Sequence, residues 1–164
     1  RLFTLSGAWA AAADRPDIAV SLATASRHLG WHAGDLEELF PDSELLADDA
    51  VSRPAGDQVV AALDAISEMP GSLERLTVLH RVLLARLAAH CVAVERATAS
   101  HADAPLARVL GFLLADLRRD RDDGEARLAR LLADVEQVER VNAAVLDAER
   151  RLVVAGGLLQ LRPG

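Results

Sequence analysis

The sequence predicts an all-α protein, and three observations support this prediction. Alanine and leucine together supply more than a third of the 164 residues, and both are strong helix formers. Aromatic residues make up only 3% of the chain, whereas strands are enriched in aromatic and β-branched types. Apolar residues recur at steps of three and four without alternating segments, which is typical of helices that share a core. The length fits one domain spanning residues 1–164.

Three helices and one loop are expected in the first part of the chain. The first helix spans 2–13 and ends just before Pro16, because a proline drives the preceding residue out of the helical region. The second spans 17–40 and carries one apolar stripe of helical period. Residues 41–56 are rich in aspartate, proline and glycine, which predicts a loop, and the whole stretch 41–71 is long enough to cross a bundle. A short helix over 57–69 follows.

The second part of the chain is expected to hold three longer helices. The spans are 72–100, 105–133 and 134–155, and the brief turn between the first two predicts antiparallel neighbours. Gly124 lies on the inward stripe of its helix, so we expect that helix to continue through its arginine-rich stretch and to pack closely there. Asp134 with a glutamine three residues later predicts a capping box, and two consecutive glycines then end the last helix.

Composition excludes several classes of chemistry and partner. The chain has no lysine and no tyrosine, so Schiff-base and tyrosyl chemistry are absent. A formal net charge of −7 disfavours nucleic acid and anionic membranes, which attract clustered positive charge. Cys91 is the single cysteine, which rules out an intrachain disulfide and a multi-cysteine zinc site. We expect no membrane span, because arginines such as Arg86 interrupt the apolar stretches.

The start of the chain resembles neither a signal peptide nor another targeting segment. Arg1 is followed by too short an apolar run and by no small-residue cleavage site. We expect a trimmed or disordered N-terminus and, with the single cysteine, a cytoplasmic location.

Five ionisable side chains lie on or beside the predicted inward stripes. His32 and His80 lie within the stripes of their helices, and His28 lies at a stripe edge one turn before His32. Asp120 follows Leu-rich stripe positions, and Asp116 precedes it by one turn. A buried carboxylate must find hydrogen bonds or a charge partner, or its pKa rises. All five are candidate ligand-binding residues, and His32, His80 and Asp120 are candidate catalytic residues.

Two interpretations of the buried acids remain open. In the first, arginines neutralise them, since Arg127 lies close to the same face and is spaced for an ion pair with Asp123. In the second, Asp116 and Asp120 join His32 and His80 in a polar interior pocket. The spacing of four between His28 and His32 also suits a metal ion, but the pair alone favours satisfied core or boundary histidines instead.

Trp31 points away from the stripe of its own helix. A large ring on an outer face indicates a second packing surface. We expect it to pack within the chain rather than against another subunit.

Four segments resemble a group of ferritin-like proteins from high-GC bacteria. They are Ser26 to Ala33 (SRHLGWHA), Leu79 to Leu83 (LHRVL), Ala102 to Pro105 (ADAP) and Val154 to Leu158 (VAGGL). The resemblance implies a ferritin-like four-helix bundle, with a long crossover that carries a short helix and with an extra C-terminal helix. Metal-binding ferritin-like proteins enclose a two-metal carboxylate site between these helices.

The ligand set of that two-metal site is incomplete here. Leu29 stands three residues before His32, where a glutamate is expected, and the helix over 105–133 has no histidine. The resemblance therefore implies a bundle with a degenerate metal site and no cofactor. Such a bundle acts as a small-ligand-binding or accessory protein, whose partners are a second copy of the chain and a small molecule in the interior.

Two other functions remain open. One is a divergent oxidoreductase or oxygenase, with iron or manganese or without metal. It would use His32 or His80 as base and Asp120 or Asp116 as the group that orients the base or binds the metal. The other is a structural scaffold without a pocket.

Overall fold

Every regular element in the described part of the chain is a helix. The computed structural model describes residues 1–40, 56–98 and 103–159. The all-α prediction is confirmed for these ranges. The loop predicted at 41–56 lies outside the described residues except for Gly56, so the structure describes only residues 56–71 of the crossover predicted over 41–71.

The helices of the first part match the prediction closely. They are α1 (Leu2–Ala11), α2 (Pro16–Glu37) and α4 (Asp57–Ser67). Pro16 occupies the first turn of α2, where its missing N–H needs no partner. The helix ends three residues before the predicted boundary, because the backbone N–H groups of Leu39 and Phe40 donate to carbonyls three positions back instead of four.

The helix predicted over 72–100 is interrupted by a wider turn. It consists of α5 (Ser72–Val78), a π-helical turn η1 (Leu79–Leu83) and α6 (Leu84–Ala97). A π-turn inserts one extra residue into the helical path and is frequent at functional sites. The apolar periodicity did not predict η1.

The last two helices follow the expected pattern. Helix α7 (Ala104–Leu131) is continuous, and α8 (Val135–Val154) follows after a short connection. One half of the predicted capping box is present, since the Asp134 side chain accepts a hydrogen bond of 2.8 Å from the Gln137 backbone N–H, whereas the Gln137 side chain accepts from the backbone N–H of Ala133 instead of Asp134. Gly156 has a φ of 84°, a left-handed conformation that favours glycine and ends the helix.

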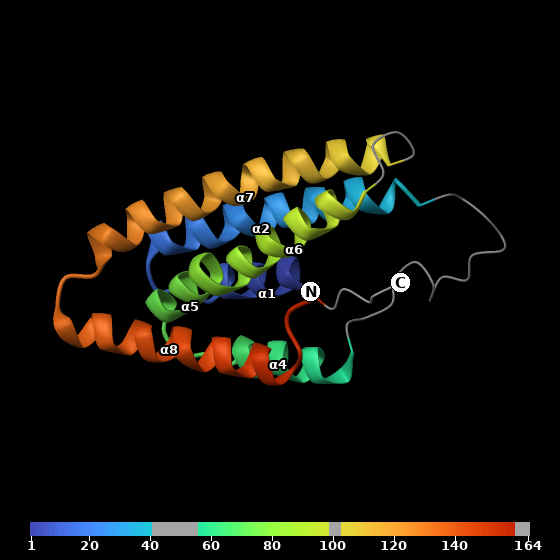
Figure 1. The fold of residues 1–164 in the computed structure, drawn as a ribbon. Coiled ribbons are helices and arrows are strands. Elements are labelled where there is room, and N and C mark those ends of the chain that lie inside the picture. Colours follow the sequence, from blue (N-terminus) through green and yellow to red (C-terminus); the bar gives the residue numbers. More distant parts are fainter. Residues whose placement is uncertain (41–55, 99–102, 160–164) are drawn as a thin grey trace.

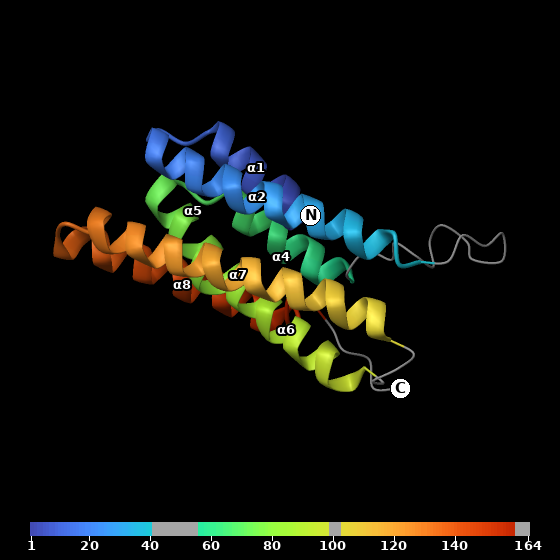
Figure 2. The same cartoon turned by 90° about the horizontal axis from the view of Figure 1, so that it is seen from above.

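The helices pack around α5 and η1. Figure 1 shows α2, α6 and α7 running together, with α8 and α4 along the opposite side of the molecule. Figure 2 shows the same arrangement from above, with α1 beside α2. Helix α5 contacts α2, α7 and α8, so it joins the two sides. The core contains mostly leucine and isoleucine, and its largest fully buried side chains include Ile18, Leu22, Ile66, Leu76, Leu79, Leu83, Leu117, Leu128 and Leu152.

One described helical stretch has the length and apolar composition of a membrane span. It runs over Ser72–Ala97, and its most apolar window is 44% buried inside the molecule. Arginines such as Arg86 do lie within this stretch, as predicted, yet its mean hydropathy is still high enough to fit a span. Because this stretch passes through the bundle core, its composition reflects burial among other helices as readily as burial in lipid.

Candidate functional site

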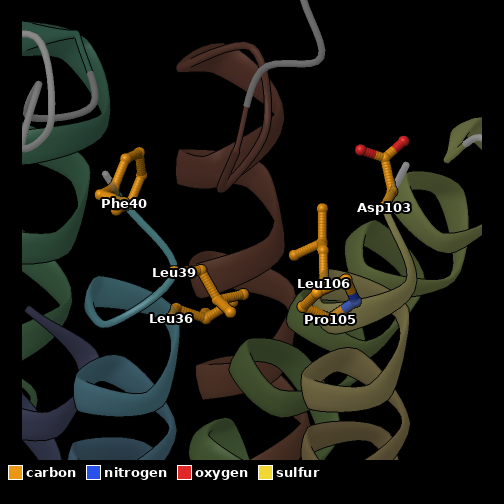
Figure 3. A pocket seen from close by; sticks show the side chains of 6 residues that line it. All are labelled: Leu36, Leu39, Phe40, Asp103, Pro105 and Leu106. Atoms are coloured by element: carbon orange, nitrogen blue, oxygen red, sulfur yellow. The ribbon is translucent and has the colours of Figure 1, made fainter. Parts of the chain in front are cut away.

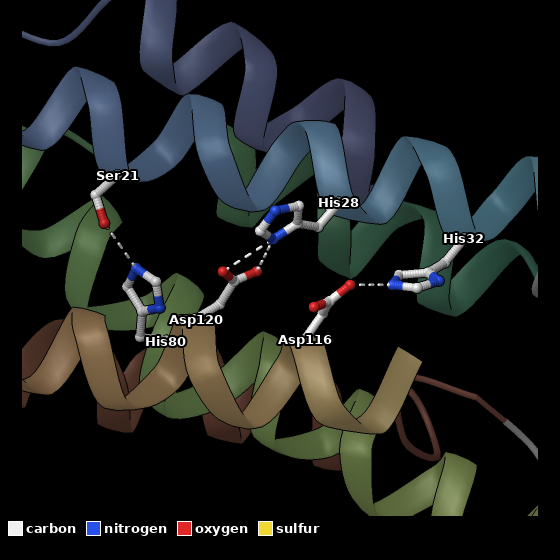
Figure 4. Close-up of polar contacts among 6 residues, drawn as sticks. All are labelled: Ser21, His28, His32, His80, Asp116 and Asp120. Carbon is white, nitrogen blue, oxygen red and sulfur yellow. Dashed lines mark hydrogen bonds and ion pairs between the residues drawn. The ribbon is translucent and has the colours of Figure 1, made fainter. Parts of the chain in front are cut away.

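Helices α2 and α7 lie antiparallel and face each other with ionisable side chains. His28 and His32 lie one turn apart on α2, and Asp120 and Asp116 lie one turn apart on α7. The opposite chain directions bring the first histidine to the second acid and the second histidine to the first acid (Figure 4). We call these four residues the His–Asp seam.

The His28–Asp120 pair forms the inner part of the seam. The Nδ1 atom of His28 lies 2.9 and 3.0 Å from the two Asp120 carboxylate oxygens and donates to them. Asp120 is only 5% exposed, as the sequence predicted. Burial raises the pKa of the Asp120 carboxyl above its usual value, and the hydrogen bond from His28 acts in the opposite direction. No described residue forms a hydrogen bond with His28 Nε2.

The His32–Asp116 pair lies one turn nearer the end of the bundle. The Nε2 atom of His32 lies 2.8 Å from an Asp116 carboxylate oxygen. Its Nδ1 atom makes no hydrogen bond with a described residue, and the Asp35 carboxylate lies 3.4 Å from it. Both ring nitrogens of His32 therefore face carboxylates, which leaves neither of them directed at open space.

His80 lies in η1 and stands apart from the seam. Its Nε2 atom is 3.3 Å from the Ser21 hydroxyl, with which it is hydrogen-bonded, whereas its buried Nδ1 has no partner among the described residues. The ring packs closely against Gly124 of α7, where a Cβ atom would lie 2.3 Å from Cγ of the ring. Burial lowers the pKa of His80 to about 4, so the ring is neutral at neutral pH.

The structure confirms the inward positions but divides the candidates into separate contacts. His28 with Asp120 and His32 with Asp116 come together, while His80 contacts Ser21 instead. The four-residue pocket of His32, His80, Asp116 and Asp120 is therefore not formed. A base oriented by an acid exists only within the two seam pairs.

Neutralisation of the buried acids by arginine, the first interpretation, is wrong. The partners of Asp116 and Asp120 are histidines of the neighbouring helix. Arg127 forms no ion pair with Asp123 in the described part of the chain, and its Nε atom is buried without a hydrogen bond there. Spacing along one helix identifies side chains that are neighbours on that helix. Which side chains of two different helices meet is decided by the register between the helices.

The donor set does not fit the two-metal centre of metal-binding ferritin-like proteins. Among the described residues, no group of three or more histidine, cysteine, aspartate or glutamate side chains is placed to hold a metal ion. The seam histidines already face the carboxylates of Asp120, Asp116 and Asp35, and a two-metal centre needs further bridging carboxylates. We therefore assign no role to iron or manganese at the seam.

The expectation that Trp31 packs within the chain is wrong. Its side chain is 59% exposed, and the Arg27 guanidinium lies over the ring at 5.1 Å from the centroid. The opposite side of α2 already packs on α7, so Trp31 points toward solvent beside α1.

Sequence reasoning missed an apolar pocket at the end of the α2–α7 pair. Its volume is about 470 Å³. Its lining comes from the end of α2, the residues after it and the start of α7, namely Leu36, Leu39, Phe40, Asp103, Pro105 and Leu106. Figure 3 shows the α2-side leucines facing Leu106 and Pro105, with Asp103 at the edge. The sequence feature that could have indicated this pocket is Phe40, a large apolar residue at the predicted helix end, which is exposed in the structure.

Comparison with models of protein families, with curated proteins and with solved structures finds no match for this chain.

Proposed function

We propose that this chain is a helical-bundle protein that binds a small amphipathic molecule with a cationic head. The pocket at the end of the α2–α7 pair carries this proposal. Its volume of about 470 Å³ lies within the range of about 300–1,000 Å³ that small-molecule sites occupy. The helix order supports a ferritin-like arrangement with a degenerate metal site as the scaffold, and the cytoplasmic location stays a prediction.

The lining favours an aliphatic tail. Leu36, Leu39, Phe40 and Leu106 contribute aliphatic and aromatic surface. Phe40 remains 49% exposed, so a tail that covers it removes apolar surface from water. Each buried methylene of the tail contributes about 0.8 kcal/mol.

The charges around the pocket favour a cationic head. Among the described lining residues Asp103 is charged, although it already takes part in an interaction of its own, and Asp35, Glu37 and Glu38 lie at the end of α2. The chain as a whole carries a formal charge of −7. An ammonium head would therefore be attracted to this end of the bundle, and a sulfate head would be repelled.

Octyltrimethylammonium and octyl sulfate have the same tail and opposite head charges. Used below their micelle concentrations, they separate the contribution of the head charge from that of the tail. We expect the cation to bind and the anion of equal tail length to bind at least about tenfold more weakly. Leu106→Arg fills the pocket with a charged side chain and should weaken cation binding by about tenfold or more. Calorimetric titration gives the affinities, and NMR shift changes at Leu36 and Leu39 locate the site.

Phe112→Arg is the matched control, because Phe112 is exposed on the same helix outside the pocket. It should leave the affinity for octyltrimethylammonium unchanged. Equal binding by Leu106→Arg and the unaltered chain, or equal binding of the two amphiphiles, would contradict the proposal.

The His28–Asp120 pair favours a second candidate function, proton transfer without a metal. Asp120 accepts the Nδ1 proton and so holds His28 in the tautomer whose Nε2 carries the lone pair. That nitrogen makes no hydrogen bond with a described residue. This arrangement suits a general base whose orientation a buried carboxylate fixes.

Hydrolysis of p-nitrophenyl acetate tests this second candidate. We expect the chain to accelerate hydrolysis above the buffer rate, and His28→Gln to abolish the acceleration. Asp120→Asn should lower it by about tenfold or more, because the tautomer is no longer fixed. His32→Gln is the control and should retain the acceleration, since both His32 nitrogens already face carboxylates. A rate that does not depend on His28 would exclude this function.

A further inference from the structure

Helix α8 carries a second apolar stripe on its outer side. Its inner side packs on α5, α4 and η1 through buried residues such as Val141 and Leu152. A separate set of residues follows the helix on the outside and forms what we call the outer stripe, namely Val135, Val138, Asn142, Leu146 and Val153. The exposed fractions of the end and middle residues are 74% for Val135, 63% for Leu146 and 64% for Val153.

The spacing of the outer stripe suits a second helix. Its members are separated by three, four, four and seven residues, which keeps them on one side of the helix. The stripe extends over most of α8, about 27 Å at the helical rise of 1.5 Å per residue. Exposed apolar stripes of this kind mark surfaces that a partner covers.

We propose that the outer stripe of α8 binds the same stripe of a second copy of this chain, in an antiparallel, two-fold symmetric pair. A two-fold interface requires a surface that is complementary to itself. With the axis near Ala144, antiparallel pairing places Val135 opposite Val153 of the second copy. The same register places Asn142 opposite Leu146, so valine pairs with valine at both ends and each Leu146 side chain lies beside Asn142 of the other copy.

Charges along the edge of the stripe support this register. Glu139 and Arg150 lie on the same edge of the outer stripe by helical periodicity, and their numbers are nearly symmetric about Ala144. In an antiparallel two-fold pair, one edge of the stripe lies beside the same edge in the other copy. Glu139 of each copy therefore lies near Arg150 of the other. The pairing therefore forms two ion pairs between copies.

The existing contacts of Arg150 leave it available for this pair. Its ion pair with Asp147 is 3.7 Å long, and its side chain is 72% exposed. Exposed pairs of this kind contribute little to stability.

Sedimentation equilibrium measures the predicted assembly. We expect a species of twice 17.5 kDa that dissociates on dilution. Leu146→Glu places a charge at the middle of the stripe and should weaken the dimer by about a hundredfold. Phe112→Glu makes the same kind of change on the exposed side of α7 and should leave the dimer unaffected. Circular dichroism establishes that each variant is folded.

Charge reversal tests the register. Glu139→Arg and Arg150→Glu should each weaken the dimer by about tenfold, and the double variant should restore it. A monomer at every concentration overturns the proposal, whether another molecule or another part of the chain covers the stripe. A dimer that tolerates Leu146→Glu, or a double variant weaker than both single variants, also overturns it.

Discussion

Replacing Gly124 with alanine is expected to destabilise the fold by about 3 kcal/mol, at the upper end of the usual cost of overpacking. The added Cβ would lie 2.3 Å from Cγ of His80 and 2.5 Å from its Nδ1. The imidazole cannot give way easily, because η1 holds it on one side and Ser21 on the other. Urea unfolding at neutral pH, followed by circular dichroism, measures the loss.

Two further variants separate the clash from the general effect of alanine in a helix. Gly111→Ala lies on the same helix with no atom within 4 Å of the new Cβ, and it should stabilise the fold by about 0.5–1 kcal/mol. His80→Ser removes the ring, so adding Gly124→Ala to that variant should cost far less than adding it to the unaltered chain. Equal costs in both backgrounds would mean that the ring is not the obstacle.

The inward place of Gly124 illustrates what the sequence could predict. Helical periodicity needs only the chain itself, so it located the inner sides of α2 and α7 and the buried Asp120. Helix ends were also predictable, because Pro16 and Gly156 act through their own backbone geometry.

Contacts between helices were less predictable. The π-turn at Leu79–Leu83 changes which residues share a side of the helix, and no local sequence pattern predicts this turn. The partners of Asp116 and Asp120 depend on the register of α7 against α2, which periodicity along one helix does not contain. The apolar pocket likewise arises only where two helix ends meet.

Trp31 shows the limit of a different argument. The prediction of its outward direction was right, but its covering was inferred from hydrophobicity alone. An indole ring with an arginine over it already has a partly favourable contact at the surface. Burial therefore depends on whether a neighbouring element reaches the ring, and in the described part of the chain none covers it.

The buried His80 is expected to make the fold less stable as the pH falls. Its pKa in the folded chain is about 4, compared with an ordinary value of 6.5. Burial is the main cause. The nearby charges act in both directions, since Glu125 and Asp123 raise the pKa while Arg127 and Arg121 lower it.

The sign follows from which state binds the proton. Above pH 6.5 the ring is neutral in both states, so His80 adds no pH dependence. Between pH 6.5 and about 4 the unfolded chain binds a proton that the folded chain excludes, and stability falls. The loss is about 2 kcal/mol at pH about 5 and levels off near 3 kcal/mol below pH about 4.

Asp120 acts in the opposite direction over a lower range. Its raised pKa means that the folded chain binds a proton more readily than the unfolded chain just above pH 3.8. Stability from this group therefore increases as the pH falls through that range. Measurements between pH about 7.5 and about 5 consequently report His80 with the least interference.

His80→Gln isolates the contribution, because glutamine does not titrate but can still hydrogen-bond to Ser21. The unaltered chain should lose about 2 kcal/mol more than this variant between pH about 7.5 and about 5, measured by urea unfolding. His90→Gln is the matched control, since His90 is half-buried on the same helical stretch and burial lowers its pKa as well. It should remove a smaller share of the pH dependence, and an identical pH profile for His80→Gln and the unaltered chain would show that His80 titrates equally in both states.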